Sequence, residues 1–377
     1  MSLGLILLIS AALTVFGVWL LIKTSIGNHF LDHCEKAHAM HVTPVPRIGG
    51  LPLAATVSII ALAMVYPRTD APVLLALIPA LFLALFSLID DRRGLPAWLR
   101  LGAHIIAAMA VVAIYQEAFV STGGRAGGVV QWLLLQPLGA VVLVIGIVWM
   151  TNLYNFMDGA NGLAGFMGLI GFGAFAVAAG ASIDISFGPT RADDIADLAM
   201  VCAAVAGACA GFLGFNFPSG RVFLGDVGSV FLGFMAGVVG LFGVLLNIWP
   251  LWFPLLVFSP FIVDASVTLL KRLVRGERIW LPHRRHVYQR LITQCGWTHR
   301  RTALCYALIM LLAAGHGVSV LIWQKAPNAS ATDPSPLPIL GAWVLIYAGL
   351  IAAVEWYLRK QKLTKTNMSS KEDQGSR

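Results

Sequence analysis

The residues best suited to chemistry form a short polar segment between two apolar stretches. The segment runs from Asn152 to Gly162 and contains one acid, three carboxamides and two glycines. Carboxylate and amide groups are costly in hydrocarbon, so they must face water, a metal, a polar ligand or polar groups of another helix. Asn152, Asn155 and Asp158 recur every three residues, so a helix would place them roughly on one face. That face could shape a ligand pocket or form a hydrogen-bonded contact between helices, and the two glycines would let a ligand approach the backbone.

Two further acidic sites occur at the ends of apolar stretches. Asp90 and Asp91 are adjacent, and two such acids repel each other unless a cation or basic neighbours offset their charge. The pair suits divalent-metal binding or proton abstraction from a phosphate-bearing substrate, or it is a structural pair neutralised by Arg92 and Arg93. Asp226 lies in a glycine-rich segment before another apolar stretch. There it could cap a helix or hold a metal that bridges phosphate oxygens.

The longest basic segment contains two histidines, His283 and His286, that frame two arginines. A basic loop near anionic headgroups commonly sets topology only. Histidines three residues apart beside arginines also suit clamping of a phosphate or diphosphate, whereas metal ligation would lack a third soft ligand. Asp264 falls inside an apolar stretch, so it is either a functional candidate or the partner of an arginine. We interpret His104 as an ordinary polar residue that interrupts an apolar stretch.

The composition places these residues in a membrane protein. Of 377 residues, 58% are hydrophobic and 12% are charged, which is outside the range of soluble proteins. At about 20 apolar residues per crossing, the sequence predicts an all-α polytopic integral membrane protein with about 11 transmembrane helices and cytoplasmic catalytic loops. We expect a single transmembrane domain over 1–358 and a disordered cytoplasmic tail over 359–377. The predicted spans are 3–22, 50–66, 72–89, 99–115, 132–151, 162–181, 196–215, 228–247, 249–270, 302–323 and 338–358.

The basic residues indicate which side of the membrane each loop occupies. When alternate loops are sorted, 22 of the 26 lysines and arginines fall on one side, which is therefore predicted to be cytoplasmic. The net charge of +8 then reflects topology, and no nucleic-acid partner is expected. Every loop that contains the candidate residues described above lies on the same side, and so does the loop from Pro44 to Gly50. This shared location predicts one composite site. The absence of an internal repeat disfavours a transporter, the main alternative class, and the intact acids disfavour an inactive scaffold.

Five motifs, in order along the chain, resemble those of the polyprenyl-phosphate N-acetylhexosamine-1-phosphate transferase family (glycosyltransferase family 4). They are Pro-Arg-x-Gly-Gly at 46–50, the Asp pair at 90–91, Asn-x-x-Asn-x-x-Asp-Gly-x-x-Gly-Leu at 152–163, Gly-Asp-x-Gly-Ser at 225–229 and His-Arg-x-His at 283–286. The last motif is more similar to the O-antigen and lipopolysaccharide-initiating branch than to the peptidoglycan branch, which typically has three histidines. The family usually has an aspartate where this chain has Asn161.

The resemblance implies transfer of an N-acetylamino-sugar 1-phosphate from a UDP-sugar to undecaprenyl phosphate, with release of UMP. The sugar would be GlcNAc or a 6-deoxy form such as FucNAc or QuiNAc, and the site would face the cytoplasm from the bacterial inner membrane. Magnesium, with manganese as a substitute, would be held by Asp226 and Asp91. A phospho-N-acetylmuramoyl-pentapeptide transferase is the alternative within the family. The resemblance is compatible with a one-step or a covalent mechanism and with a homodimer.

The resemblance also implies roles for individual residues. Asp90 would deprotonate or orient the lipid phosphate. The implied catalytic residues are Asp90, Asp91, Asp158, Asp226 and His283, and the implied substrate-binding residues are Arg47, Asn152, Asn155, Asn161, Asn216, Arg284 and His286.

Overall fold

The computed structural model describes residues 1–24, 31–32, 45–65, 68, 71–121, 129–183, 189–279, 281, 283–325 and 337–375. Pro44, at the start of the first polar loop, lies outside these residues. The described part is almost entirely α-helical, as expected for a chain that must satisfy its backbone hydrogen bonds within lipid. Its strands are β1 (Leu31–Asp32) and β2 (Val45–Pro46), which pair antiparallel.

Nine helical segments in the described part are long and apolar enough to cross a membrane. They are α1 (Leu3–Lys23), α3 with α4 (Pro72–Leu75 and Leu77–Arg93), α5 (Ala97–Ser121), α7 (Pro137–Phe156), α8 (Leu163–Gly180), α9 (Pro189–Asn216), α10 (Gly225–Leu245), α14 (His299–Gln324) and α15 (Leu337–Gly375). The predicted all-α polytopic class is therefore confirmed.

The other two predicted spans are present as shorter helices. The span at 50–66 is α2 (Gly50–Val65), whose 16 described residues are fewer than the roughly 20 of a typical crossing. The span at 249–270 is divided into α11 (Trp252–Val257) and α12 (Ser259–Val274). Pro260 follows this break and cannot donate a backbone hydrogen bond, so the helix does not continue through it. The count of eleven spans remains a prediction.

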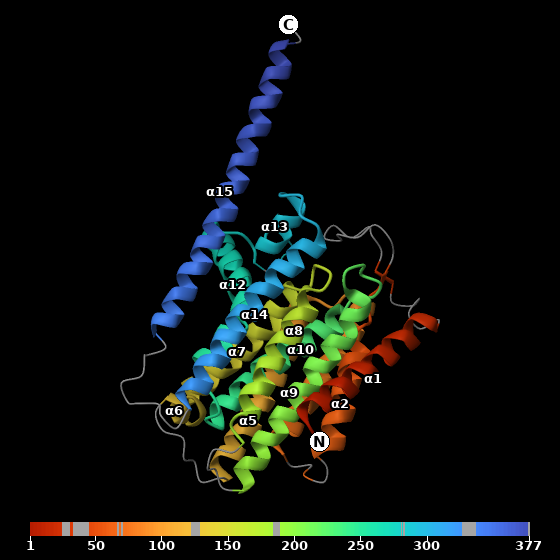
Figure 1. Ribbon diagram of the computed structural model, residues 1–377, viewed down its shortest axis with the longest axis vertical. Helices are drawn as coiled ribbons and strands as arrows, with labels where there is room; N and C mark the ends of the chain where they lie inside the picture. The colour runs from red at the N-terminus through yellow and green to blue at the C-terminus, as the bar shows by residue number, and fades with distance from the viewer. Residues whose placement is uncertain are drawn as a thin grey trace.

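Helix α10 lies at the centre of the bundle and α15 at its outside (Figure 1). Of the apolar window of α10, 94% is buried, against 11% for that of α15. Small residues let neighbours approach α10 closely: a Cβ at Gly233 would lie 2.6 Å from Cβ of Tyr154 on α7. This close contact fixes α7, which ends in the Asn152–Gly162 segment, against α10, which begins beside Asp226.

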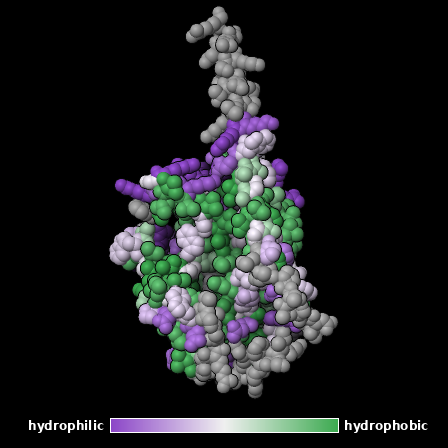
Figure 2. Space-filling model, turned by 90° about the vertical axis from the view of Figure 1, so that its left-hand side faces the viewer, coloured by the Kyte–Doolittle hydropathy of each residue, from purple (hydrophilic) through white to green (hydrophobic). Residues whose placement is uncertain are grey.

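The surface of the bundle has the distribution expected of a membrane protein. Figure 2 shows an apolar belt, with hydrophilic residues gathered where α15 leaves the bundle. Two short helices, α6 (Val129–Leu135) and α13 (Val287–Thr293), complete the fold. Helix α15 extends to Gly375, so its backbone is helical through most of the segment for which we predicted disorder.

Candidate active site

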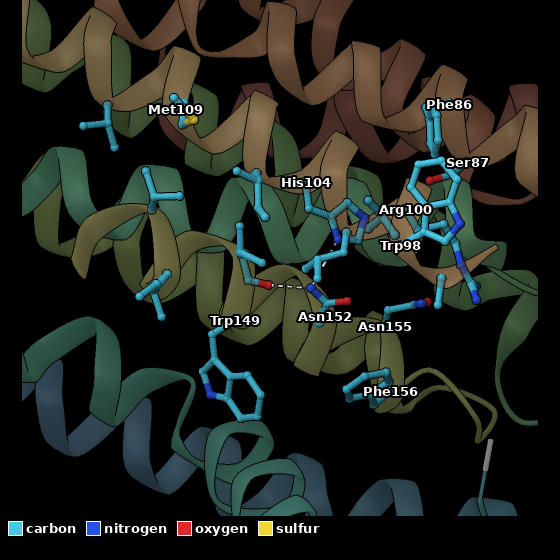
Figure 3. Close-up of a pocket in the computed structure, with 18 of the residues that line it drawn as sticks. Phe86, Ser87, Trp98, Arg100, His104, Met109, Trp149, Asn152, Asn155 and Phe156 are labelled. Atoms are coloured by element: carbon cyan, nitrogen blue, oxygen red, sulfur yellow. Dashed lines mark hydrogen bonds between the residues drawn. The ribbon is translucent and has the colours of Figure 1, made fainter. Parts of the chain in front are cut away.

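Polar residues from three helices meet at one cavity. Asp90 lies near the end of α4, Asn152 and Asn155 lie in the last turns of α7, and Asp226 lies in the first turn of α10. All four line a cavity of about 1200 Å³ whose other walls are mainly apolar. Figure 3 shows Asn152, Asn155 and Arg100 toward one end of this cavity and Met109 toward the other.

Arg47 reaches this group because its backbone segment pairs with the loop before α10. The Gly50 N–H donates to the Leu224 carbonyl at 2.8 Å. A Cβ at Gly50 would lie 2.2 Å from the backbone nitrogen of Gly228, so the two segments can meet only without a side chain there. The pairing places Nη2 of Arg47 2.6 Å from Oδ1 of Asp226.

The Asp90 carboxylate is held by the turn that ends α4. Gly94 has φ +62°, a left-handed conformation that ends the helix. The Leu95 N–H can then donate back to Oδ1 of Asp90 at 2.7 Å, and Nη1 of Arg100 lies 3.5 Å from Oδ2. Asp91 is half-buried but is not among the residues that line the cavity, since successive helical residues point roughly 100° apart.

Asp158 lies in the loop after α7 and shares Arg47 with Asp226. Burial raises the pKa of the Asp158 carboxyl to about 7, the positive charge of Arg47 opposes this rise, and the negative charge of Asp226 adds to it. A carboxyl group with a pKa near neutrality can accept or donate a proton under physiological conditions.

The two carboxamides of α7 are fixed by hydrogen bonds. Ser229 Oγ donates to Oδ1 of Asn155 at 2.6 Å, and Nδ2 of Asn152 donates to the Val148 carbonyl at 2.7 Å. Nδ2 of Asn152 also lies 3.2 Å from Nδ1 of His104, which belongs to the cavity wall. Our interpretation of His104 as an ordinary polar residue did not predict this position in the cavity wall. Its spacing of four residues from Arg100, which also lines the cavity, could have indicated a shared helix face.

Asn161 and Asn216 join two loops and are not among the residues that line the cavity. Asn216 Oδ1 accepts the Gly162 N–H at 2.6 Å, and its Nδ2 donates to the Val222 carbonyl at 2.8 Å. Asn161 Nδ2 donates to the Pro218 carbonyl at 3.1 Å. The structure thus gives both residues a part in holding the loop after α7 against the loop before α10. Their contact with substrate stays a prediction.

The segment from His283 to His286, called here the His-Arg loop, lies beside the cavity. Its residues differ in exposure. His283 is half-buried, and burial, together with the nearby His286 and the positive charges of Arg272 and Arg285, lowers its pKa to about 4. Arg284 is half-buried, whereas His286 is only 2% exposed. The His286 ring is stacked near that of Phe156, a cavity-lining residue, at 6.1 Å between centroids. His286 thus contacts a cavity-lining residue but is not itself among the residues that line the cavity.

The residues present fit a hard divalent cation that is completed by substrate. In the described part of the chain, no three acidic, histidine or cysteine side chains are grouped to hold a metal by themselves. Magnesium commonly binds one or two carboxylates and takes its remaining ligands from water and substrate phosphates. The Asp226 side chain is 14% exposed at the cavity wall and could supply such a carboxylate. Asp91 lies outside that wall, so the structure gives it less support as a second ligand.

Together, the fold and the site define a class: a helical membrane protein with a cavity that has mainly apolar walls and polar residues at one end. The model of glycosyl transferase family 4 matches residues 73–244, from α3 into α10. The chain belongs to this family, that of the polyprenyl-phosphate N-acetylhexosamine-1-phosphate transferases, as the motifs predicted. It is therefore a membrane phosphotransferase that acts on a polyprenyl phosphate.

Three relatives illustrate the range of the family. A decaprenyl-phosphate N-acetylglucosaminephosphotransferase of Mycolicibacterium smegmatis is 31% identical, over 77% of this chain and 75% of the relative. A probable undecaprenyl-phosphate N-acetylglucosaminyl 1-phosphate transferase of Bacillus subtilis is 27% identical, over 76% and 75%. A phospho-N-acetylmuramoyl-pentapeptide-transferase of Bacillus velezensis is 26% identical, over 84% and 95%.

Proposed function

We propose that the protein transfers an N-acetylamino-sugar 1-phosphate from a UDP-sugar to undecaprenyl phosphate and releases UMP. The proposal places this reaction at the cytoplasmic face of the bacterial inner membrane, as the first step in the synthesis of O-antigen or another surface polysaccharide. The names of the relatives from M. smegmatis and B. subtilis support an N-acetylglucosamine-type sugar and a polyprenyl-phosphate acceptor.

The observation that carries the proposal is the division of the cavity into an apolar and a polar part. Its apolar walls come chiefly from α5 and α7 and include Leu101, Ile105, Met109, Val112, Val141, Val144 and Val148. A long isoprenoid chain needs such a surface. Asp90, Arg100 and Asp226 lie on the same cavity wall, where a phosphate attached to that chain would lie.

The proposed chemistry follows from these positions. An oxygen of the lipid phosphate attacks the sugar-linked phosphorus of the UDP-sugar, and the bond from that phosphorus to the bridging oxygen breaks. UMP leaves with the electron pair. Asp90 orients the lipid phosphate and accepts its proton where one is present, and Arg100, 3.5 Å from Asp90, offsets the negative charge. A magnesium or manganese ion held by Asp226 would neutralise charge on the diphosphate.

The remaining polar residues suit the nucleotide-sugar. Asn152, Asn155 and Asp158 present amide and carboxyl groups for the sugar nucleotide, and Arg47 supplies positive charge for its phosphates. His283 and Arg284 would contribute from the adjacent loop, His283 as a neutral hydrogen-bond donor because its pKa is lowered to about 4.

A peptidoglycan-type transferase is the second candidate, because a relative with that activity aligns with 84% of the chain. The His-Arg-Arg-His sequence at 283–286 supports the first proposal instead, since the resemblance associates three histidines with the peptidoglycan branch.

A substrate panel separates these candidates. Purified enzyme would be supplied with undecaprenyl phosphate, Mg²⁺ and one of UDP-GlcNAc, UDP-GalNAc, UDP-FucNAc, UDP-QuiNAc or UDP-MurNAc-pentapeptide, and UMP release would be measured. We expect lipid-dependent UMP from at least one amino sugar. Release from the pentapeptide substrate alone would support the second candidate, and no lipid-dependent release from any substrate would contradict both.

A further inference from the structure

A buried acid outside the cavity, Asp264 on α12, binds the start of α13. Asp264 is 4% exposed. Its Oδ1 accepts the backbone N–H of Val287 at 2.7 Å, and its Oδ2 accepts the N–H of Tyr288 at 3.1 Å. The Tyr306 hydroxyl on α14 donates to the same Oδ2 at 2.6 Å. Both carboxylate oxygens are therefore used, and two of the donors belong to the residues that directly follow the His-Arg loop.

The loop itself is close to the same carboxylate. Nδ1 of His286 lies 3.6 Å from Oδ1 of Asp264, which is slightly longer than a hydrogen bond. The His283 and His286 rings have centroids 4.8 Å apart. Asp264 thus lies beside His286, whose ring in turn lies beside that of His283.

The start of α13 also contacts the Asn152–Gly162 segment. The Tyr288 hydroxyl donates to the Phe156 carbonyl at 3.0 Å, at the last residue of α7. Gly159 lies against the same hydroxyl, because a Cβ there would be 2.2 Å from it. A continuous series of contacts therefore leads from Asp264 through Tyr288 to the loop that contains Asp158.

We propose that Asp264 is a positioning residue that holds the His-Arg loop and the Asn152–Gly162 segment in one fixed arrangement at the cavity. This inference rests on the proposed function, since the reaction needs these two segments to surround one diphosphate. Asp264 does not touch substrate in this account. It acts through the backbone of Val287 and Tyr288, and misplacement of catalytic groups by about 1 Å can lower a rate about 10²-fold.

The carboxylate is needed because its two oxygens both accept hydrogen bonds. An asparagine would present one oxygen and one NH₂ group, so either the Val287 N–H or the Tyr288 N–H would lose its acceptor. The unpaired amide would then exchange its hydrogen faster.

The test combines hydrogen–deuterium exchange with kinetics on purified full-length protein. For Asp264→Asn, we expect exchange over residues 284–292 to be about tenfold faster or more. We also expect kcat of the folded protein to fall about 10²-fold, with KM for the UDP-sugar changed less than about threefold. The matched control is Asp197→Asn. Asp197 is also a buried acid, and it accepts Nη1 of Arg68 at 2.8 Å at the opposite end of α2 from Gly50. This control should lose stability without either effect.

A second variant keeps the test valid if Asp264→Asn does not fold. Tyr288→Phe removes only the hydroxyl that reaches Phe156, so it should speed exchange over residues 153–162 and lower kcat about tenfold. Unchanged exchange in both variants would overturn the inference, whatever the activity, and so would a kcat within about twofold of wild type despite faster exchange. If exchange rises as expected but the wild-type protein releases no UMP from any UDP-sugar, the proposed function fails while the anchoring by Asp264 stands.

Discussion

At the scale of single residues, the charge state of each polar group depends on its surroundings more than on its type. Asp158 and His283 were both predicted as catalytic from their motifs. The structure raises the pKa of Asp158 to about 7 and lowers that of His283 to about 4. Neither shift could be predicted from the sequence, because each arises mainly from burial, which depends on the fold, and for Asp158 also from Arg47 and Asp226, which lie far away along the chain.

The lowered pKa of His283 predicts how stability depends on pH. The unfolded chain binds a proton at His283 near pH 6.5, whereas the folded protein does so only near pH 4. Stability should therefore fall as the pH drops from about 6.5 to 4. His283→Asn should remove this contribution of about 1 kcal/mol, after allowance for partial exposure, or about 2 °C in Tm. Thermal unfolding in detergent at pH 7 and pH 5 measures it. An equal drop in Tm for variant and wild type would contradict the assignment.

The sequence motifs predicted some residues of the candidate site and missed others. The motifs predicted Arg47, Asp90, Asn152, Asn155 and Asp226, which the structure brings to one place. They missed Arg100 and His104, which belong to α5 and to none of the five motifs. The burial of His286 was also unpredictable, since the ring packs against Phe156 of α7 and lies beside Asp264 of α12, which are distant from it along the chain.

At the scale of elements, hydropathy predicted where the helices are but could not predict how the loops pair. In the described part of the chain, nine of the eleven predicted spans are helices long and apolar enough to cross a membrane, because a long apolar run can satisfy its backbone in lipid only as a helix. The division between α11 and α12 was missed although Pro260 lies within the run. The residues around β2 pair with the loop before α10. No local sequence pattern predicts this pairing, because the two segments are about 180 residues apart, as the separation of Arg47 from Asp226 shows.

That pairing gives a test at Gly50. A Cβ there would lie 2.3 Å from Cα of Gly228, so Gly50→Ala must push β2 away from α10 and separate Arg47 from Asp226. We expect kcat/KM to fall about 10²-fold. Gly173→Ala on α8 is the matched control, because a Cβ at Gly173 has no atom within 4 Å. Steady-state UMP release measures both variants. Equal activities would show that the contact at Gly50 does not set the site.

At the scale of the whole molecule, the bundle combines an apolar surface for the membrane with a cavity that joins apolar and polar walls. Figure 2 shows the apolar belt, and the cavity runs beside α5 and α7. Under the proposed function, one physical reason explains both why the protein is embedded in the membrane and where its site lies. A polyprenyl acceptor would keep its chain in apolar surroundings while its phosphate reaches Asp90.

Filling the apolar part of the cavity tests this explanation. Ala113 lines the cavity from α5, whereas Ala110 on the same helix is exposed and is not among the lining residues. Ala113→Trp should raise KM for undecaprenyl phosphate about tenfold and leave KM for the UDP-sugar nearly unchanged, since it removes apolar space only. Ala110→Trp should leave both constants unchanged. An equal rise in both KM values for Ala113→Trp would argue against a lipid chain in this cavity.

The most direct test of the central claim is UMP release by purified Asp226→Asn, with undecaprenyl phosphate, Mg²⁺ and the UDP-sugar that the wild-type enzyme uses. Asp226 lies where Arg47, the cavity and the expected diphosphate meet. Asp193→Asn is the control, because Asp193 is 64% exposed beside Arg68, at the far end of α2 from Gly50. Loss of this carboxylate should lower UMP release about 10²- to 10³-fold or more, with the control at wild-type rate. Wild-type release by Asp226→Asn would contradict the assignment of this cavity as the site of phosphoryl transfer.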